Sequence, residues 1–157
     1  MTGLKQEIKQ KRPFRSVQEE VVLALARTAD ILAAPLNELL RASDLSASQY
    51  NVLRILRGAG ETGLPCGEIS SRMVRRDPDL TRLLDKLEAR GLVRRARSTE
   101  DRRVVTASIT APALKLLDQL DGPVDETLKR TLARVPAARL RTLLEILEEL
   151  RGPSDER

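Results

Sequence analysis

The spacing of apolar residues along this chain predicts a mainly helical protein with one interruption by two short strands. Apolar side chains recur at helical spacing between positions 17 and 39. Ser16 with Glu19 has the form of a capping box, so a long first helix is predicted. Pro35 lies inside it and is expected to kink or split the helix, because proline lacks a backbone N–H and its ring meets the preceding turn.

Two short helices are expected to follow. Ser46 and Gln49 repeat the capping pattern, and the helix that they begin is expected to stop at Gly58. Pro65 suits the first turn of the next helix, which carries Met73 toward the core.

A fourth helix has the strongest signals in the chain. Asp77 is expected as its N-cap, Pro78 as its first residue and Gly91 as the cap that ends it. Its apolar positions, which follow helical spacing on one face, are Leu80, Leu83, Leu84 and Leu87. The opposite face is polar, so we expect it to meet solvent or a partner.

Residues 92–97 and 103–109 read as two strands joined by a turn at 98–101, which makes them a hairpin. Thr110 can cap the next helix, and the Gly122-Pro123 pair is expected to interrupt that helix.

Pro136 is expected to begin a last helix with a leucine stripe that reaches Leu150. The residues that follow, 152–157, are expected to be frayed.

The composition excludes several kinds of protein. Aromatic residues make up 1% of the chain, so its core must be aliphatic, and the absence of His removes the commonest general base and transition-metal ligand. We therefore expect that the protein is not an enzyme and binds neither a metal ion nor a cofactor. Cys66 stands alone, and we expect a small buried residue there rather than an oxidant sensor. No apolar run is long enough to span a membrane, so a cytoplasmic protein is expected.

The positive charge is confined to two stretches. Lys and Arg exceed Asp and Glu by 4 in residues 1–16 and by 4 in residues 68–103, within a total of +5. A localised basic surface is typical of proteins that bind phosphates, although a solvated basic face fits the charge alone equally well.

The stretch from Asp79 to Thr110 resembles the MarR family of bacterial transcriptional regulators. The family's recognition helix, Gly-Leu-Val, basic strand, Asp-Arg-Arg turn and Leu-Thr are present, with Ile109 in place of the Leu. Residues 45–53 resemble the second helix of that family, so the similarity covers about residues 45–110. The resemblance implies a winged helix-turn-helix, flanking helices that pair two subunits, and effectors held between the dimer helices and the DNA-binding lobe.

Three regions follow from this resemblance and from the helix pattern. We expect a basic disordered arm over 1–15, a DNA-binding lobe over 45–110, and a helical dimerisation region over 16–44 and 111–151. A lobe of roughly 65 residues cannot cover the apolar stripes of both end helices, so a homodimer is expected. The residues expected at the dimer interface are Val17, Val21, Leu25, Leu140, Leu143, Leu144 and Leu147.

The recognition helix is expected to read base edges, because an α-helix fits the major groove and presents its first turns there. Arg82 suits guanine through its planar fork, and the alternative is a surface ion pair with Asp79 or Asp85. Asp79 either stabilises the helix N-terminus or accepts a hydrogen bond from N4 of cytosine. The expected major-groove residues are Asp79, Thr81, Arg82 and Lys86.

The hairpin is expected to act as a wing that enters the minor groove, with Arg103 as its probe. The resemblance implies that Asp101 orients the basic residues beside it. The expected wing residues are Arg94, Arg95, Arg97, Asp101, Arg102 and Arg103, and the expected phosphate contacts on the preceding helix and turn are Ser70, Arg72, Arg75 and Arg76. For each of these arginines, solvation without DNA contact is the alternative.

The sequence therefore predicts a sequence-specific regulator, a repressor that binds a palindromic site in double-stranded DNA as a homodimer. Release by a small anionic or amphipathic effector is part of this hypothesis, and its pocket is expected to be aliphatic with Arg or hydroxyl anchors. The alternative is a winged-helix module that binds nucleic acid without sequence choice or docks a protein.

Overall fold

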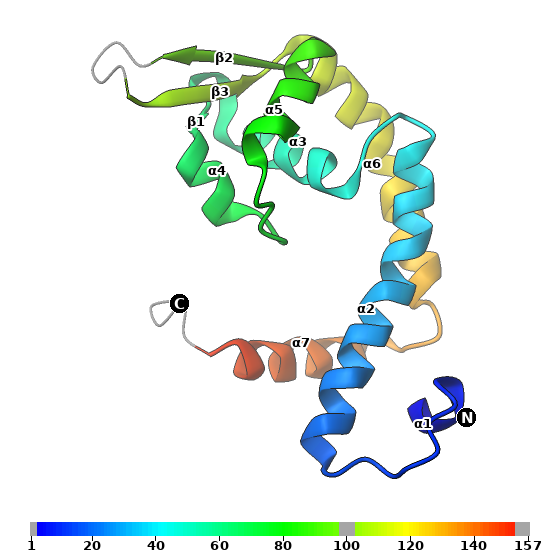
Figure 1. Ribbon diagram of the computed structural model, residues 1–157. Coiled ribbons are helices and arrows are strands. Elements are labelled where there is room, and N and C mark those ends of the chain that lie inside the picture. Colours follow the sequence, from blue (N-terminus) through cyan, green and yellow to red (C-terminus); the bar gives the residue numbers. More distant parts are fainter. Residues whose placement is uncertain (1–2, 98–102, 153–157) are drawn as a thin grey trace.

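The computed structural model describes residues 3–97 and 103–152, and it has the predicted fold class: mainly helical, with a small antiparallel sheet. Figure 1 shows a lobe that holds the sheet at one end of two long helices, α2 and α6, which run side by side. In chain order the elements are α1 (Leu4–Glu7), α2 (Val17–Arg41), α3 (Ala47–Ala59), the 3-10 turn η1 (Gly60–Thr62), β1 (Leu64–Pro65), α4 (Cys66–Arg72), α5 (Leu80–Ala89), β2 (Val93–Arg97), β3 (Val105–Ile109), α6 (Ala111–Leu132) and α7 (Ala137–Arg151).

Pro35 was expected to kink or split the helix, and α2 continues through it as one helix, so the split does not occur. The leucines that follow the proline explain why the helix continues: Leu40 is fully buried, and Leu36 and Leu39 pack against the same core. Their packing holds the last turns in helical register despite the lost backbone hydrogen bond.

α6 also continues through Gly122 and Pro123, where an interruption was predicted. Leu120 before this pair and Val124 and Thr127 after it are all buried. The two halves therefore share one buried face, and tertiary packing outweighs the local helix-breaking tendency.

Side-chain caps mark the starts of α2, α3 and α5. α3 has the predicted capping box, in which Ser46 and Gln49 each accept the other's backbone N–H. The N-cap of α5 lies two residues later than predicted. It is Asp79, not Asp77, and it accepts the N–H of Arg82 at 3.2 Å. Asp77 instead accepts the N–H of Asp79 at 3.0 Å, which forms the turn that leads into the helix.

The sheet has the strand order β1-β3-β2, and both pairings are antiparallel. The predicted hairpin is present, with Arg95 opposite Ala107. β1 was not predicted, since two residues carry no alternation that could be recognised. Gly63, at φ +67°, lies so close to β3 that a Cβ there would come 2.2 Å from the carbonyl oxygen of Ala107.

The core is aliphatic as predicted, and Tyr50 is its one aromatic member among the described residues. This core joins the lobe to the end of α2 and the first half of α6. The largest fully buried side chains are Leu40, Leu53, Leu56, Ile69, Leu84, Leu87, Leu117 and Val52.

The ends of the chain lie outside this core. Within the arm that we expected to be disordered, α1 forms a single turn held by local backbone bonds such as Ile8 N–H to Leu4 O at 3.0 Å. α7 buries none of its residues. Among the described helices, none combines the length and apolar character that crossing a membrane requires.

Candidate nucleic-acid interface

α5 presents a polar face because its leucines are used inside. Leu83, Leu84 and Leu87 are buried in the core of the lobe, which fixes the rotation of the helix. The exposed polar side chains of the helix are Thr81, Arg82, Asp85 and Lys86. A helix of this kind can enter a groove without losing any of its own packing.

The Arg82 side chain makes no hydrogen bond or ion pair with any other residue in the described ranges. Both carboxylates considered as partners of its guanidinium make other contacts. Asp79 accepts the backbone N–H of Arg82 as the helix cap, and Asp85 pairs with Arg95 at 2.5 Å. With Lys86, Arg82 lines an open pocket of about 360 Å³ between the starts of α3 and α5.

Arg95, on β2, is held by two carboxylates of α5. Its Nη2 lies 2.5 Å from Asp85 Oδ1 and 2.6 Å from Glu88 Oε2, while its Nε donates to Glu88 Oε2 at 2.9 Å. Its backbone N–H also donates to Glu88 Oε1 at 3.0 Å. These hydrogen bonds lower the pKa of the Glu88 carboxyl and raise that of Arg95. Sequence reasoning placed Arg95 among the DNA contacts and assigned no role to Glu88.

The other wing residues differ from Arg95 in their exposure. Arg94, Arg97 and Arg103 are exposed. Asp101 and Arg102 lie outside the described residues.

The residues expected to contact phosphate lie on α4 and in the turn that follows it. Arg72 forms an ion pair with Glu68 at 2.7 Å, so part of its charge is compensated. Ser70 is half-buried, whereas Arg75 and Arg76 are exposed. The turn is anchored from α3, where the side-chain oxygen of Asn51 accepts the N–H of Val74 at 2.9 Å. Sequence analysis did not identify Asn51, because its partner lies 23 positions away.

Cys66, at the start of α4, is half-buried. Burial raises the pKa of its thiol, and the charge of Arg95 lowers it by a smaller amount. The thiol is therefore less acidic than usual, which is the opposite of what an oxidant-sensing cysteine needs.

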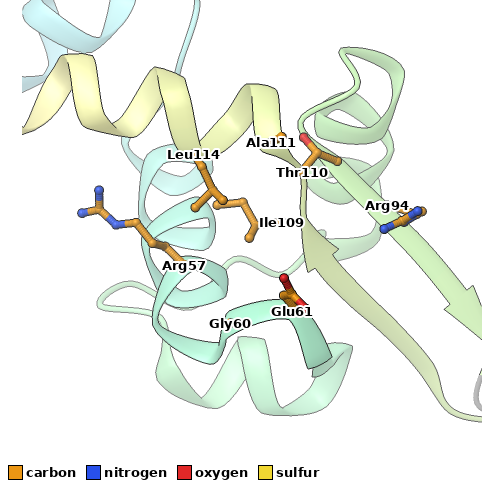
Figure 2. Close-up of a pocket in the computed structure, with 8 residues that line it drawn as sticks. All are labelled: Arg57, Gly60, Glu61, Arg94, Ile109, Thr110, Ala111 and Leu114. Atoms are coloured by element: carbon orange, nitrogen blue, oxygen red, sulfur yellow. The ribbon is translucent and has the colours of Figure 1, made fainter.

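Behind the wing lies an open pocket of about 840 Å³. Figure 2 shows Ile109 and Leu114 near its centre, with Arg57 and Arg94 at opposite edges. Arg57 is paired with Asp121, while the guanidinium of Arg94 has no partner within the described part of the chain. The remaining lining residues are Gly60, Glu61, Thr110 and Ala111.

The predicted dimer residues keep much of their apolar surface exposed. Val17 is 71% and Leu144 57% exposed, and Val21, Leu25 and Leu143 are also exposed, while Leu140 and Leu147 are partly buried. Further large apolar residues exposed on α2 and α7 are Val22, Leu23, Ile31, Ile146 and Leu150. A single subunit leaves both stripes largely uncovered.

Comparisons with known proteins agree with this geometry. The sequence model of the MarR family matches residues 45–105 of this chain. The crystal structure of a MarR transcription factor from Planctomyces limnophilus is 40% identical and covers 86% of this chain and 98% of its own, with a TM-score of 0.67. The HTH-type transcriptional repressor IacR of Pseudomonas putida is 28% identical over 79% of this chain and 73% of its own length. A mutant MarR from E. coli, complexed with operator DNA, shares the fold at 23% identity, with a TM-score of 0.77 over 97% of this chain and all of that one.

Proposed function

The chain belongs to the MarR family of transcription regulators, which bind DNA and are not enzymes, and from this premise we propose that it represses transcription from a palindromic operator as a homodimer. We propose in addition that a small anionic or amphipathic effector releases it.

The observation that carries the proposal is the guanidinium of Arg82 on the exposed face of α5, which pairs with no other residue in the described part of the chain. A planar fork with no partner in the described residues can donate two bonds to O6 and N7 of guanine. Thr81 and Lys86 extend the same face toward neighbouring base pairs, while Asp79 acts as the cap of the helix.

The wing and the turn before α5 supply contacts of a second kind. We propose that Arg103 enters the minor groove, with Asp101 and Arg102 beside it, and that Arg94 and Arg97 meet phosphates. Ser70, Arg72, Arg75 and Arg76 would bind the backbone on the other side of α5. Such contacts set orientation and affinity rather than sequence choice.

A second copy of this chain is the partner that suits α2 and α7. Their exposed apolar residues lie within the helical segments 16–44 and 111–151, which we propose as the dimerisation region around the DNA-binding lobe 45–110. Isologous pairing buries both stripes at once and relates two α5 helices by a two-fold axis. Two such helices read half-sites roughly 34–36 Å apart, which is one turn of DNA.

The pocket behind the wing supports the effector part of the proposal. Ile109 and Leu114 offer apolar surface, and Arg94 offers a positive charge with no partner among the described residues, so the lining suits a ligand with an apolar body and an anionic group. Since the pocket touches both β3 and the start of α6, a ligand there contacts the wing strand and the dimerisation region together.

The experiment that tests the proposal recovers the DNA itself. The purified full chain is mixed with random-sequence duplex DNA at moderate salt, and the retained fragments are sequenced. We expect an inverted repeat with half-site centres about 10 bp apart. Retention with no enriched sequence would instead favour the module without sequence choice.

A further inference from the structure

We propose that Arg95 is a positioning residue, which locks the wing to the recognition helix through Asp85 and Glu88, and not a phosphate contact. The inference rests on the proposed DNA interface, and it assigns Asp85 and Glu88 a role in operator selection.

The geometry is that of a clamp between two elements. Asp85 and Glu88 are three positions apart on α5, so they lie on one face of the helix. The Arg95 guanidinium reaches both, and Glu88 also accepts the backbone N–H of Arg95. Glu88 therefore fixes both the main chain of β2 at Arg95 and the side chain of Arg95.

The position of Arg95 in the strand makes the clamp effective. Arg95 is the central residue of β2, and its partner on β3 is the fully buried Ala107. Both strands of the wing are thus tied to α5 at one level. The arginines on either side of this level, Arg94 and Arg97, are left exposed.

Charge argues against a phosphate contact at Arg95. One guanidinium stands beside two carboxylates, so the cluster carries a net negative charge and repels a phosphate. The Arg95 side chain is also only 23% exposed. Its neighbour Arg94 has neither restriction, and therefore serves as the matched control on the same strand.

Recognition needs the clamp because two grooves are read at once. α5 fixes the register in the major groove, and the wing must then meet the adjacent minor groove without further adjustment. Sites that bind such a rigid partner tolerate displacements of only about 0.5 Å. A wing released from α5 loses its contacts on the operator, while general attraction to DNA persists.

The test compares Arg95→Gln, Glu88→Gln and Arg94→Gln in the full chain, on the recovered operator and on scrambled DNA, over a range of salt. We expect Arg95→Gln to bind the operator about tenfold more weakly, similar to one mismatched base pair. Binding to scrambled DNA should weaken much less than binding to the operator, and the salt slope should stay near its wild-type value. Arg94→Gln should weaken both DNAs alike and flatten the slope by about 0.9.

Glu88→Gln gives the sharpest contrast, since it removes a negative charge near DNA at a site that is 38% exposed and leaves a side chain of the same size. A positioning role predicts weaker operator binding, and pure electrostatics predicts tighter binding. The proposal is overturned if Glu88→Gln binds the operator more tightly, or if Arg95→Gln behaves like Arg94→Gln. If the wild type itself shows no operator preference, it is the proposed function that fails.

Discussion

Arg57 on α3 and Asp121 on α6 form a two-pronged ion pair, with Nη1 2.8 Å from Oδ2 and Nη2 3.0 Å from Oδ1. The two residues are 64 positions apart in the sequence. The pair ties the DNA-binding lobe to the long helix that leads to α7, just before Gly122 and Pro123. It therefore contributes to the angle at which each lobe is held.

Removing this pair should cost stability. We expect Asp121→Asn to lower the free energy of unfolding by about 0.5–1 kcal/mol, since a fork-shaped pair at a partly exposed site lies at the upper end of surface ion pairs. Urea unfolding at neutral pH measures it. Asp118→Asn is the control: its carboxylate is 3.7 Å from Arg57 and 73% exposed, so its loss should cost less. Equal losses of stability in the two variants would mean that the short hydrogen bonds between Arg57 and Asp121 do not stabilise the fold more than the longer contact with Asp118.

The same pair predicts a pH dependence. The hydrogen bond from Arg57 lowers the pKa of Asp121 below its ordinary value, so the carboxylate stabilises the fold in full above about pH 4. The contribution disappears as the pH falls through the lowered pKa, because protonation removes the charge that Arg57 binds. The stability difference between wild type and Asp121→Asn should therefore shrink in acid. A difference that stays constant down to pH 3 would count against this account.

Gly63 predicts a steric effect on the wing. Gly63→Ala adds a Cβ 2.2 Å from the Ala107 carbonyl oxygen, whereas Gly60→Ala, at a similar positive φ, meets nothing within 4 Å. We expect Gly60→Ala to cost about 1 kcal/mol of backbone strain and Gly63→Ala about 2 kcal/mol more, because β3 must move. Thermal unfolding of both variants separates strain from clash. Similar costs would show that β3 accommodates the new atom.

Arg82 predicts a change in sequence preference. Arg82→Ala should relax the choice of base at one position in each half-site, with a loss of roughly 1–3 kcal/mol of discrimination there. Competition binding with operators changed at single positions measures it. Arg97→Ala is the control, expected to weaken all sequences alike through a lost phosphate contact. Unchanged discrimination in Arg82→Ala would remove the role that we assign to this residue.

The stripe on α7 predicts an assembly state. Leu144→Glu places a charge in the apolar surface and should weaken self-association at least about tenfold, as measured by sedimentation. Thr142→Glu adds the same charge at an exposed polar position of the helix and should have little effect. If both variants assemble like the wild type, α7 does not form the interface.

Local patterns predicted most of the elements, because the leucines at helical spacing in α5 and the capping box of α3 are short-range signals. The errors arose where distant packing decides. Pro35 does not break its helix because Leu36, Leu39 and Leu40 after it pack in the core. Pro123 does not break its helix because buried residues lie on both sides of it. Asp77 precedes the helix in a turn where it accepts the N–H of Asp79, and that turn is anchored to Asn51 on α3 through Val74.

The candidate site was predictable by residue type but not by partner. The exposed face of α5 follows from periodicity. The pairing of Arg95 with Asp85 and Glu88 depends on how the wing lies against the helix, which no spacing in the sequence reveals. That contact separates two neighbouring arginines, Arg94 and Arg95, that look alike in the sequence.

The central claim is that the exposed face of α5 selects a DNA sequence. The most direct measurement is the affinity of the full chain for its recovered operator against scrambled DNA of the same length and composition, at physiological salt. We predict that the operator binds at least about 10³-fold more tightly. Equal affinity for the two DNAs would contradict the claim.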